Sequence, residues 1–339
     1  MAAITNNYCC FFYPMKYVAI FLLAFCCHAN AQPLDSALQN NLYKHVSALA
    51  HDSMQGRFTG TAEMYKAAAY IKQQFTAAGL KPIAGYANYY DTFTAKGAFD
   101  STKEYNGVNV IGAIAGAALS NEMVIFCAHY DHVGTKELNP YKKYKAFLDS
   151  TDNVYNGAND NAAGTAALIE IAKAYALDSV KPLRTILFIA FSGEELGVLG
   201  SKHFTSLIEN YENVKAVINL EMLGRPGDEG YIITGDKLSD FRKNVNNNIK
   251  NIKGLKTKFR FKADDNIFEN LFARSDNYPF AQQGIIAHTI MGTPTDDTYY
   301  HTEKDDITTI DFVQFAKTFS IVIKACRPIL QGQTFKYYR

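Results

Sequence analysis

The pattern of apolar and polar residues differs between two parts of the chain. Between residues 34 and 80 the apolar residues recur at helical spacing, which predicts helices at 37–50 and 62–80 with a turn at 56–60 between them. From residue 108 onward, short runs rich in β-branched and aromatic residues alternate with helical segments. The strands predicted from these runs are 108–114, 123–128, 183–191, 214–220, 231–234 and 285–290. The helices predicted between and after them are 161–175, one beginning near 195, 237–252 and 310–330.

The predicted strand at 183–191 is apolar on both faces, because residues 185–191 read Thr-Ile-Leu-Phe-Ile-Ala-Phe. A strand of this kind belongs to a sheet that helices cover on both sides, and strands that alternate with helices favour parallel pairing. No internal repeat or low-complexity linker interrupts the pattern. We therefore expect a single α/β domain, with a helical N-terminal part at 32–105, a core at 106–330 and a C-terminal tail at 331–339.

The first 31 residues have the pattern of a secretory signal peptide. Lys16 precedes an apolar run at 17–27, and a small-residue cleavage signal, Ala-Asn-Ala, ends at Ala31. The run is too short to cross a bilayer, and no later segment reaches the roughly 20 apolar residues that a membrane span needs. We expect cleavage after Ala31 and a mature protein that is secreted or periplasmic, without a stable membrane anchor.

Two alternatives remain open for this segment. Cys26 permits lipid modification, although Phe25 is bulky where such signals usually carry a small residue. Met15 directly precedes the charged residue and is an alternative start to Met1.

The composition gives no global clue to the function. The 34 Lys and Arg residues balance 33 Asp and Glu residues, so neither a nucleic acid nor an acidic membrane is indicated as the main partner. Of six cysteines only Cys127 and Cys326 lie beyond the predicted signal, which excludes a disulfide-stapled fold and leaves one possible bond open. The function must therefore come from a local site.

Ionisable residues gather where the predicted strands end. Ligands of open α/β sheets bind beyond the carboxyl ends of the strands. Taken singly, Asp160 would cap a helix, Glu194 and Glu195 would complement a helix dipole, and His301 would be a surface histidine. Together they are mutually repelling carboxylates mixed with imidazoles, a set that needs a cation and matches the ligands of zinc. The residues at these strand ends are His129, Asp131, Asp160, Glu194, Glu195, Glu221 and His301.

Six segments in a fixed order resemble the zinc-dependent M28 aminopeptidases of the secreted bacterial type. The resemblance covers roughly residues 105–325 and implies the zinc-exopeptidase fold, a three-layer α/β sandwich with a central mixed, largely parallel sheet. It makes residues 106–330 the metallopeptidase core. The matching segments are Ala-His-Tyr-Asp-His at 128–132, Gly-Ala-Asn-Asp-Asn-Ala-Ala-Gly at 157–164, Phe-Ser-Gly-Glu-Glu at 191–195, Asn-Leu-Glu-Met at 219–222, Arg-Ser-Asp at 274–276 and Tyr-His-Thr at 300–302.

The resemblance implies a metal centre with two zinc ions. His129 and Glu221 hold one ion, Glu195 and His301 hold the other, and Asp160 bridges both. Because many family members carry Asp where this chain has Glu221, a single-metal enzyme stays open.

The resemblance also implies roles for residues that bind no metal. Glu194 is the general base that takes a proton from the metal-bridging water, and Asp131 orients His129. Tyr300 donates a hydrogen bond to the developing oxyanion, and Arg274 lines the substrate pocket.

The implied activity is removal of the N-terminal residue from peptides with a free N-terminus. One alternative is a single-zinc glutaminyl cyclase, whose pockets have tryptophan walls that this tryptophan-free chain lacks. Another is a non-catalytic receptor or scaffold, although such relatives lose metal ligands or the base. A carboxypeptidase would need a carboxylate pocket, which Arg274 alone does not establish. The spacer at 136–156 either shapes the cleft or is a surface insertion, and the oligomeric state stays open.

Overall fold

An eight-stranded sheet runs through the computed structural model of this chain, which describes residues 34–141, 151–226, 230–264, 270–292 and 297–338. The strand order across the sheet is β1-β2-β4-β3-β5-β8-β6-β7. The strands are β1 (Tyr90–Lys96), β2 (Glu104–Ile114), β3 (Leu119–His129), β4 (Arg184–Phe191), β5 (Val214–Glu221), β6 (Ile232–Ile233), β7 (Lys262–Ala263) and β8 (Ala287–Met291).

The centre of the sheet is parallel, and the strands next to it on both sides, β2 and β6, run antiparallel to it, while β7 at the edge pairs in parallel with β6. Strands β4, β3, β5 and β8 pair in parallel, whereas β2 runs antiparallel to both β1 and β4, and β6 runs antiparallel to β8. The predicted mixed, largely parallel sheet is therefore confirmed. Because the four central strands point the same way, their carboxyl ends meet along one edge of the sheet.

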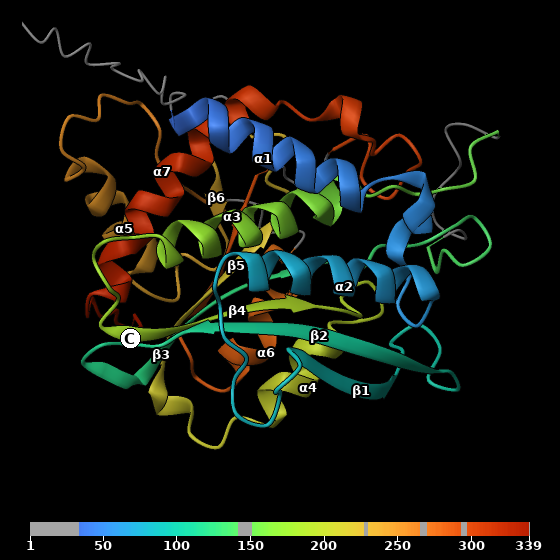
Figure 1. Cartoon of the computed structure of the whole chain (residues 1–339), viewed down its shortest axis with the longest axis horizontal. Coiled ribbons are helices and arrows are strands. Elements are labelled where there is room, and N and C mark those ends of the chain that lie inside the picture. The colour runs from blue at the N-terminus through green and yellow to red at the C-terminus, as the bar shows by residue number, and fades with distance from the viewer. Residues whose placement is uncertain (1–33, 142–150, 227–229, 265–269, 293–296, 339) are drawn as a thin grey trace, which may run out of the picture. The chain divides into compact units, whose positions relative to one another are not determined.

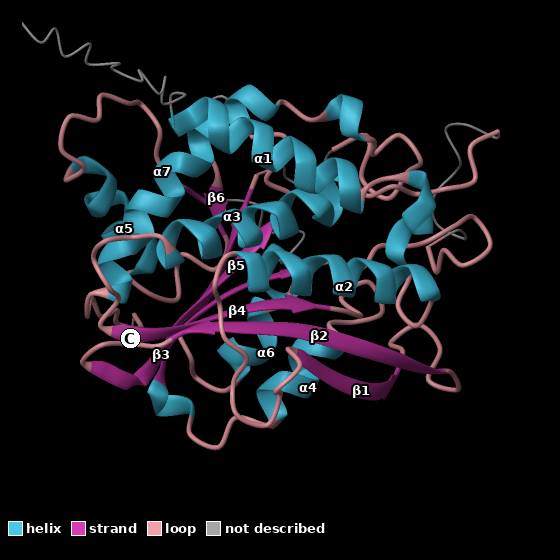
Figure 2. Ribbon diagram, viewed as in Figure 1, coloured by secondary structure: helices cyan, strands magenta, loops and turns pink. Residues whose placement is uncertain are grey.

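Helices cover both faces of this sheet and complete three layers (Figures 1 and 2). On one side, Phe75 and Phe126 pack against Phe188 of β4. On the other, Phe204 and Phe280 pack against Phe191 of the same strand. The helices of the first side are α1 (Leu34–Leu49), α2 (Ala62–Ala77), α3 (Gly164–Ala176), α5 (Phe241–Lys250) and α7 (Phe312–Leu330), and those of the second are α4 (Leu199–Ser206) and α6 (Asn277–Gln282).

Two predicted helix starts are wrong, and both errors fall at the site. The helix expected from residue 195 begins at Leu199, because Gly193 and Gly197 have positive φ and turn the chain first. The helix expected from about residue 161 begins at Gly164, and Asp160 and Asn161 lie before it with non-helical dihedral angles. Asp160 and Glu195 are therefore turn residues. The sequence pattern also gave no indication of β7 or α6, which have only two and six residues.

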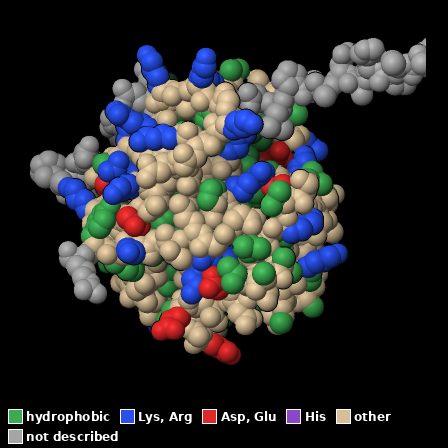
Figure 3. Space-filling view, turned by 90° about the vertical axis from the view of Figure 1, so that its left-hand side faces the viewer, with side chains coloured by type: hydrophobic (Ala, Val, Ile, Leu, Met, Phe, Trp, Pro, Cys, Tyr) green, Lys and Arg blue, Asp and Glu red, His purple; other side chains and the backbone are tan. Residues whose placement is uncertain are grey.

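The described residues contain no helix that is both long and apolar enough to cross a membrane. The predicted signal peptide, with its cleavage point at Ala31, lies outside them. On the face drawn in Figure 3, Lys and Arg side chains are spread among neutral and hydrophobic ones, with a few Asp and Glu side chains between them. Cys127 and Cys326 are both buried free thiols, so the bond left open between them is absent.

Candidate metal centre

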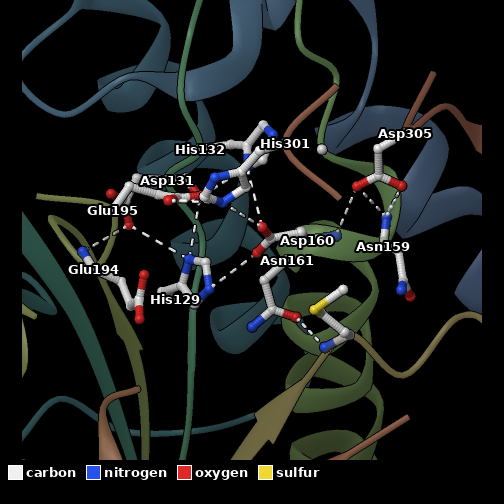
Figure 4. Close-up of polar contacts among 12 residues, drawn as sticks. His129, Asp131, His132, Asn159, Asp160, Asn161, Glu194, Glu195, His301 and Asp305 are labelled. Atoms are coloured by element: carbon white, nitrogen blue, oxygen red, sulfur yellow. Dashed lines mark hydrogen bonds and ion pairs between the residues drawn. The ribbon is translucent and has the colours of Figure 1, made fainter. Parts of the chain in front are cut away.

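The candidate ligands all lie at the carboxyl edge of the central strands. Figure 4 shows four of them, His129, Asp160, Glu195 and His301, facing one another. His129 is the last residue of β3, and Glu221 is the last residue of β5. Glu195 follows β4, His301 follows β8, and Asp160 lies just before α3. The structure thus brings together, from five separate segments, the five residues that the sequence suggested as metal ligands.

A first potential metal-binding group consists of His129, Asp160 and Glu221. Each offers one donor atom, and these atoms all lie within 4.8 Å of one another. His129 Nε2 is 3.2 Å from Glu221 Oε1 and 3.4 Å from Asp160 Oδ1. Tetrahedral zinc with bonds of about 2.0–2.1 Å separates its ligand atoms by about 3.3 Å, so these spacings fit one ion. The longer side chain of Glu221 reaches this group.

A second group consists of His132, Asp160, Glu195 and His301. His301 Nε2 lies 3.1 Å from Asp160 Oδ2 and 3.1 Å from Glu195 Oε2, again the spacing of atoms around one ion. Asp160 contributes one oxygen to each group, as a bridging carboxylate would. His132 is the one member that the sequence analysis did not single out.

The ionisable side chains of the candidate metal centre are almost completely buried. His129, Asp160, Glu195, Glu221 and His301 are only 1–4% exposed. Burial opposes protonation of His301, but Glu195 and Asp160 outweigh it and raise its pKa to about 9. Burial likewise disfavours ionised Glu195, yet His301 helps to lower its pKa to about 2. The centre therefore attracts positive charge, and a metal ion that bound there would displace the protons from the imidazoles.

Several buried polar atoms of the second group have no hydrogen-bond partner. These atoms are His132 Nδ1, Asp160 Oδ2, Glu195 Oε1 and His301 Nε2. A buried polar atom without a partner costs about 1–3 kcal/mol, and buried charged groups are tolerated when they coordinate metals. The donor set and its spacing therefore fit a metal such as zinc.

Glu194 belongs to neither group, as expected for a residue that binds no metal. It is half-buried and lines a cavity of about 40 Å³ together with His129, Asp160 and Glu221. Burial raises the pKa of Glu194 well above its ordinary value, and the carboxylate of Glu195 adds to this effect. A carboxylate of raised basicity thus faces the same cavity as the metal-binding groups.

Asp131 is fully buried and fixed by its surroundings. Thr59 Oγ1 donates to its carboxylate at 2.9 Å, and so does the backbone N–H of Glu194 at 3.3 Å. The His129 ring faces Asp131 through Nδ1, which is 3.7 Å from Oδ1 and only 3.2 Å from the main-chain oxygen. The nearer partner of the imidazole is therefore the backbone of Asp131.

The segment at 274–276 contributes more than the predicted Arg274. Arg274 is exposed and lines the 40 Å³ cavity. Ser275 Oγ donates to Glu221 Oε2 at 2.7 Å, which positions that carboxylate. Asp276 is completely buried, its carboxylate makes no hydrogen bond, and burial raises its pKa to about 7. The sequence segment was recognised, but neither of these two residues was given a role.

Two tyrosines pack around His301. The ring of Tyr300 stacks on it with centroids 3.8 Å apart, and Tyr300 lines the cavity beside Glu194. Tyr141 lies 4.4 Å away on the same imidazole and donates its hydroxyl to the main-chain oxygen of Glu195 at 3.2 Å. Tyr141 belongs to the spacer at 136–156, so part of that spacer lies against the centre, while 142–150 falls outside the described residues.

Arg57 holds two segments of the centre together. Its buried guanidinium donates to the main-chain oxygens of Tyr130, Asn156 and Gly157 at 2.7, 2.7 and 3.1 Å, and to that of Leu49 at 2.7 Å. Tyr130 adjoins His129, and Gly157 leads into the turn before Asp160. The turn at 56–60 therefore has a structural role that the sequence did not reveal.

A buried, metal-competent centre at the carboxyl edge of an α/β sheet is typical of a metallohydrolase. The model of one family, Peptidase family M28, matches residues 109–326. This match covers more than half of the chain, and the chain therefore belongs to peptidase family M28. The prediction of a family M28 peptidase is confirmed.

Two curated relatives match part of this chain. The alkaline phosphatase isozyme conversion protein of Escherichia coli is 30% identical over 213 residues, which is 62% of this chain and 55% of that protein. Aminopeptidase YwaD of Bacillus subtilis is 33% identical over 164 residues, 44% of this chain and 33% of the relative. The chain thus matches about half or less of the length of these relatives.

Solved structures share the fold at low sequence identity. A Zn-dependent exopeptidase from Parabacteroides distasonis has a TM-score of 0.64 and 17% identity, and the match covers 87% of this chain and 98% of that one. The glutaminyl cyclase of Porphyromonas gingivalis also has a TM-score of 0.64, with 16% identity over 86% of this chain and 98% of its own. The zinc-exopeptidase fold is therefore confirmed, and it is shared by enzymes of two different activities.

Proposed function

We propose that the chain is a zinc-dependent aminopeptidase that hydrolyses the N-terminal peptide bond of peptides. The observation that carries this proposal is the pair of donor groups that share Asp160, with Glu194 in the same small cavity but outside both groups. A hydrolytic centre needs both features, an electrophilic metal site and a separate proton acceptor.

Glu194 is proposed as the general base. Zinc, when bound by these residues, polarises the scissile carbonyl and lowers the pKa of water. Glu194 accepts a proton from the attacking water and returns it to the leaving amine. Burial raises the pKa of Glu194 above its ordinary value, which makes its carboxylate a stronger base for this exchange.

Tyr300 and Asp131 are proposed in supporting roles. Tyr300 lines the cavity beside Glu194, where its hydroxyl can donate to the oxyanion that forms on the substrate. Losing one such donor typically costs about 10²–10³ in rate. Asp131 fixes the His129 ring through its main-chain oxygen, and its own carboxylate is held by Thr59.

The cavity favours attack at the end of a peptide. It has a volume of only about 40 Å³ and is lined by the carboxylates of Asp160, Glu194 and Glu221. When metal occupies Asp160 and Glu221, the amine of a free amino terminus can bind a metal ion or Glu194, whereas an acetylated terminus has no free amine to bind. A larger cavity of about 360 Å³ shares Glu194, Arg274 and Tyr300 with it and offers room for the remainder of the peptide.

We propose two zinc ions per chain. The group of His129, Asp160 and Glu221 has its donor atoms as close together as the second group does. Glu221 reaches this group although Asp is more usual at its position, and this geometry supports a first metal position.

We also propose that residues 1–31 are removed on export, after Ala31, and that residues 32–105 and 106–330 form one catalytic domain. The signal pattern in the sequence supports the first point. Sequencing the N-terminus of the protein recovered outside the cytoplasm tests it, since a terminus at Met1 or Met15 contradicts cleavage at Ala31.

The decisive experiment compares three peptides with purified mature enzyme. One has a free apolar N-terminal residue, the second is its acetylated form, and the third begins with glutamine. We expect release of the N-terminal residue from the first peptide and none from its acetylated form, no cyclisation of the glutaminyl peptide, and about two zinc ions per chain. Equal cleavage of the acetylated peptide contradicts the aminopeptidase. Cyclisation of the glutaminyl peptide without hydrolysis of the first would instead identify a cyclase, which shares this fold.

A further inference from the structure

His132 lies three residues beyond His129 in the turn that follows β3. The two histidines lie near different oxygens of the shared Asp160 carboxylate. His129 Nε2 is 3.4 Å from Asp160 Oδ1, and His132 Nδ1 is 3.7 Å from Asp160 Oδ2. The end of β3 therefore supplies one imidazole to each metal-binding group.

The His132 ring is fully buried and lacks hydrogen-bond partners for its nitrogens. It has no exposed surface, and neither of its ring nitrogens makes a hydrogen bond. A neutral imidazole carries one donor and one acceptor nitrogen, so both are left unsatisfied by the protein. Burial of such a ring beside two carboxylates is costly unless it binds something else.

A hydrogen bond to Glu195 does not account for this ring. His132 Nδ1 lies 2.8 Å from Glu195 Oε1, which is close enough, yet both atoms lack a hydrogen-bond partner. At that distance only the direction can fail, because a ring N–H must point along the line to its acceptor. The nitrogen and the oxygen are therefore close neighbours without an aligned hydrogen bond, and both belong to a group whose donor atoms lie within 4.8 Å of one another.

The backbone holds the ring in this orientation. A Cβ atom on Gly157 would lie 2.5 Å from His132 Cγ, so the main chain of Gly157 packs directly against the imidazole. On another side the ring meets His301 edge-on, with centroids 5.6 Å apart. His132 has no room to turn away, and its Nδ1 is preorganised within the group.

From this geometry we propose that His132 is a direct metal ligand that completes a four-residue site with Asp160, Glu195 and His301. This assignment rests on the proposed zinc centre. The two metal positions then differ, because one has four protein ligands with two imidazoles and the other has three with one. Four protein ligands are typical of tightly held zinc, and three leave a coordination position for substrate or water. The position with His132 therefore retains its ion longer.

The test measures zinc retention and ligand type separately. Wild type and His132→Ala are dialysed against rising chelator concentrations, and the zinc that remains is counted and analysed by X-ray absorption for the number of imidazoles per ion. We expect wild type to lose one zinc first and to retain a second with two imidazoles. His132→Ala is expected to bind this second zinc more than about 100-fold more weakly, with one imidazole fewer.

A matched control and a second variant keep the test decisive. His203→Ala removes a partly exposed histidine that pairs with Asp91 outside the centre, and its zinc profile should equal that of wild type. His132→Asn keeps more of the side-chain volume and should show the same loss as His132→Ala if the alanine variant folds poorly, as judged by circular dichroism.

The outcomes distinguish the proposed role of His132 as a metal ligand from the proposed aminopeptidase activity. An unchanged imidazole count in the His132 variants overturns the proposal, even if affinity falls by 10–100-fold, which is the size of effect expected from a residue that only supports a ligand. A different outcome is also informative: the wild-type protein could hold zinc through two imidazoles and yet release no N-terminal residue. That result would support His132 as a ligand and refute the proposed aminopeptidase activity.

Discussion

Within the part of the chain that the structure describes, two buried clusters bring histidine next to carboxylate, and they differ in how their hydrogen bonds are completed. In the α1–α3 polar cluster, formed by Asn41, His45, Tyr70 and Glu170, each ring nitrogen of His45 has a partner: Tyr70 Oη at 2.7 Å and Glu170 Oε1 at 3.2 Å. Asn41 donates to the other oxygen of Glu170 at 3.0 Å. In the metal centre, His132, Asp160, Glu195 and His301 each keep a buried atom with no hydrogen bond.

Histidine beside a buried acid is therefore not sufficient to indicate a metal site. Native proteins satisfy nearly all their buried polar atoms, and a closed network such as the α1–α3 polar cluster contributes to the stability of the fold. A set of adjacent unsatisfied donors and acceptors indicates a partner from outside the chain. The difference between the two clusters yields paired predictions, in which one substitution changes activity and its counterpart changes stability.

The largest difference in turnover is expected between the variants Glu194→Gln and Glu170→Gln. Glu194→Gln removes the proposed base while leaving both metal-binding groups intact, so turnover should fall by about 10²–10⁴ with unchanged zinc content. Glu170→Gln alters only the closed cluster and should leave turnover near that of wild type. Peptide hydrolysis and zinc analysis of both variants check this. Full activity in Glu194→Gln would exclude it as the base.

The two clusters also each contain a tyrosine. Tyr300→Phe should lower kcat by about 10²–10³, because the hydroxyl is proposed to stabilise the transition state, with little change in stability. Tyr70→Phe removes the hydrogen-bond partner of His45 Nδ1 and should cost about 1 kcal/mol in the free energy of unfolding, with kcat preserved. Steady-state kinetics and urea denaturation measure the two effects. A kcat loss in Tyr70→Phe would mean that the clusters are coupled.

Substitution of Arg57 tests whether a fully hydrogen-bonded network also positions the residues of the metal centre. Lysine cannot reach the four main-chain oxygens that Arg57 binds, so Arg57→Lys should cost at least about 3 kcal/mol in the free energy of unfolding. It should also weaken zinc binding, because the segments that carry His129 and Asp160 are no longer held together.

Arg184 provides the matched control. It too is buried and donates to main-chain oxygens, those of Ile329, Gly332 and Gln333, but on the C-terminal segment. Arg184→Lys should lower stability without changing zinc affinity, as measured by chelator competition. Equal zinc affinity in both variants would contradict the positioning role of Arg57.

The sequence predicted the central strands and the strand-end ligands because these depend on local patterns. Runs such as 183–191 are apolar on both faces, and residues that follow parallel strands meet at one edge. The two-residue β7 is too short to produce a pattern. The turn before Leu199 looked helical because positive φ at Gly193 and Gly197 is a property of the folded backbone.

The residues that were missed depend on contacts between distant segments. Arg57 lies in a polar turn and looks exposed in the sequence, yet acceptors up to 100 residues away enclose it. His132 follows His129 so closely that only the folded turn after β3 shows that it faces the second group. The doublet of histidines at 129 and 132 was the available signal, but spacing alone does not tell which ring points inward.

The smallest effect concerns the pH dependence of the α1–α3 polar cluster. Burial opposes ionisation of Glu170, but hydrogen bonds from His45 and Asn41 outweigh it and lower its pKa below the ordinary value. A carboxyl whose pKa is lowered on folding stabilises the fold above its unfolded pKa of about 4.3, and this contribution is lost as the pH falls through the folded pKa.

Glu170→Gln should therefore cost about 1 kcal/mol at pH 7 and progressively less at pH values below 4. Urea denaturation of metal-free wild type and variant across this range measures the difference, because without metal the protonation of zinc ligands is common to both proteins. A constant difference between the two at all pH values would contradict the lowered pKa. It would also show that Glu170 acts through neutral hydrogen bonds, unlike the charged carboxylates of the metal centre.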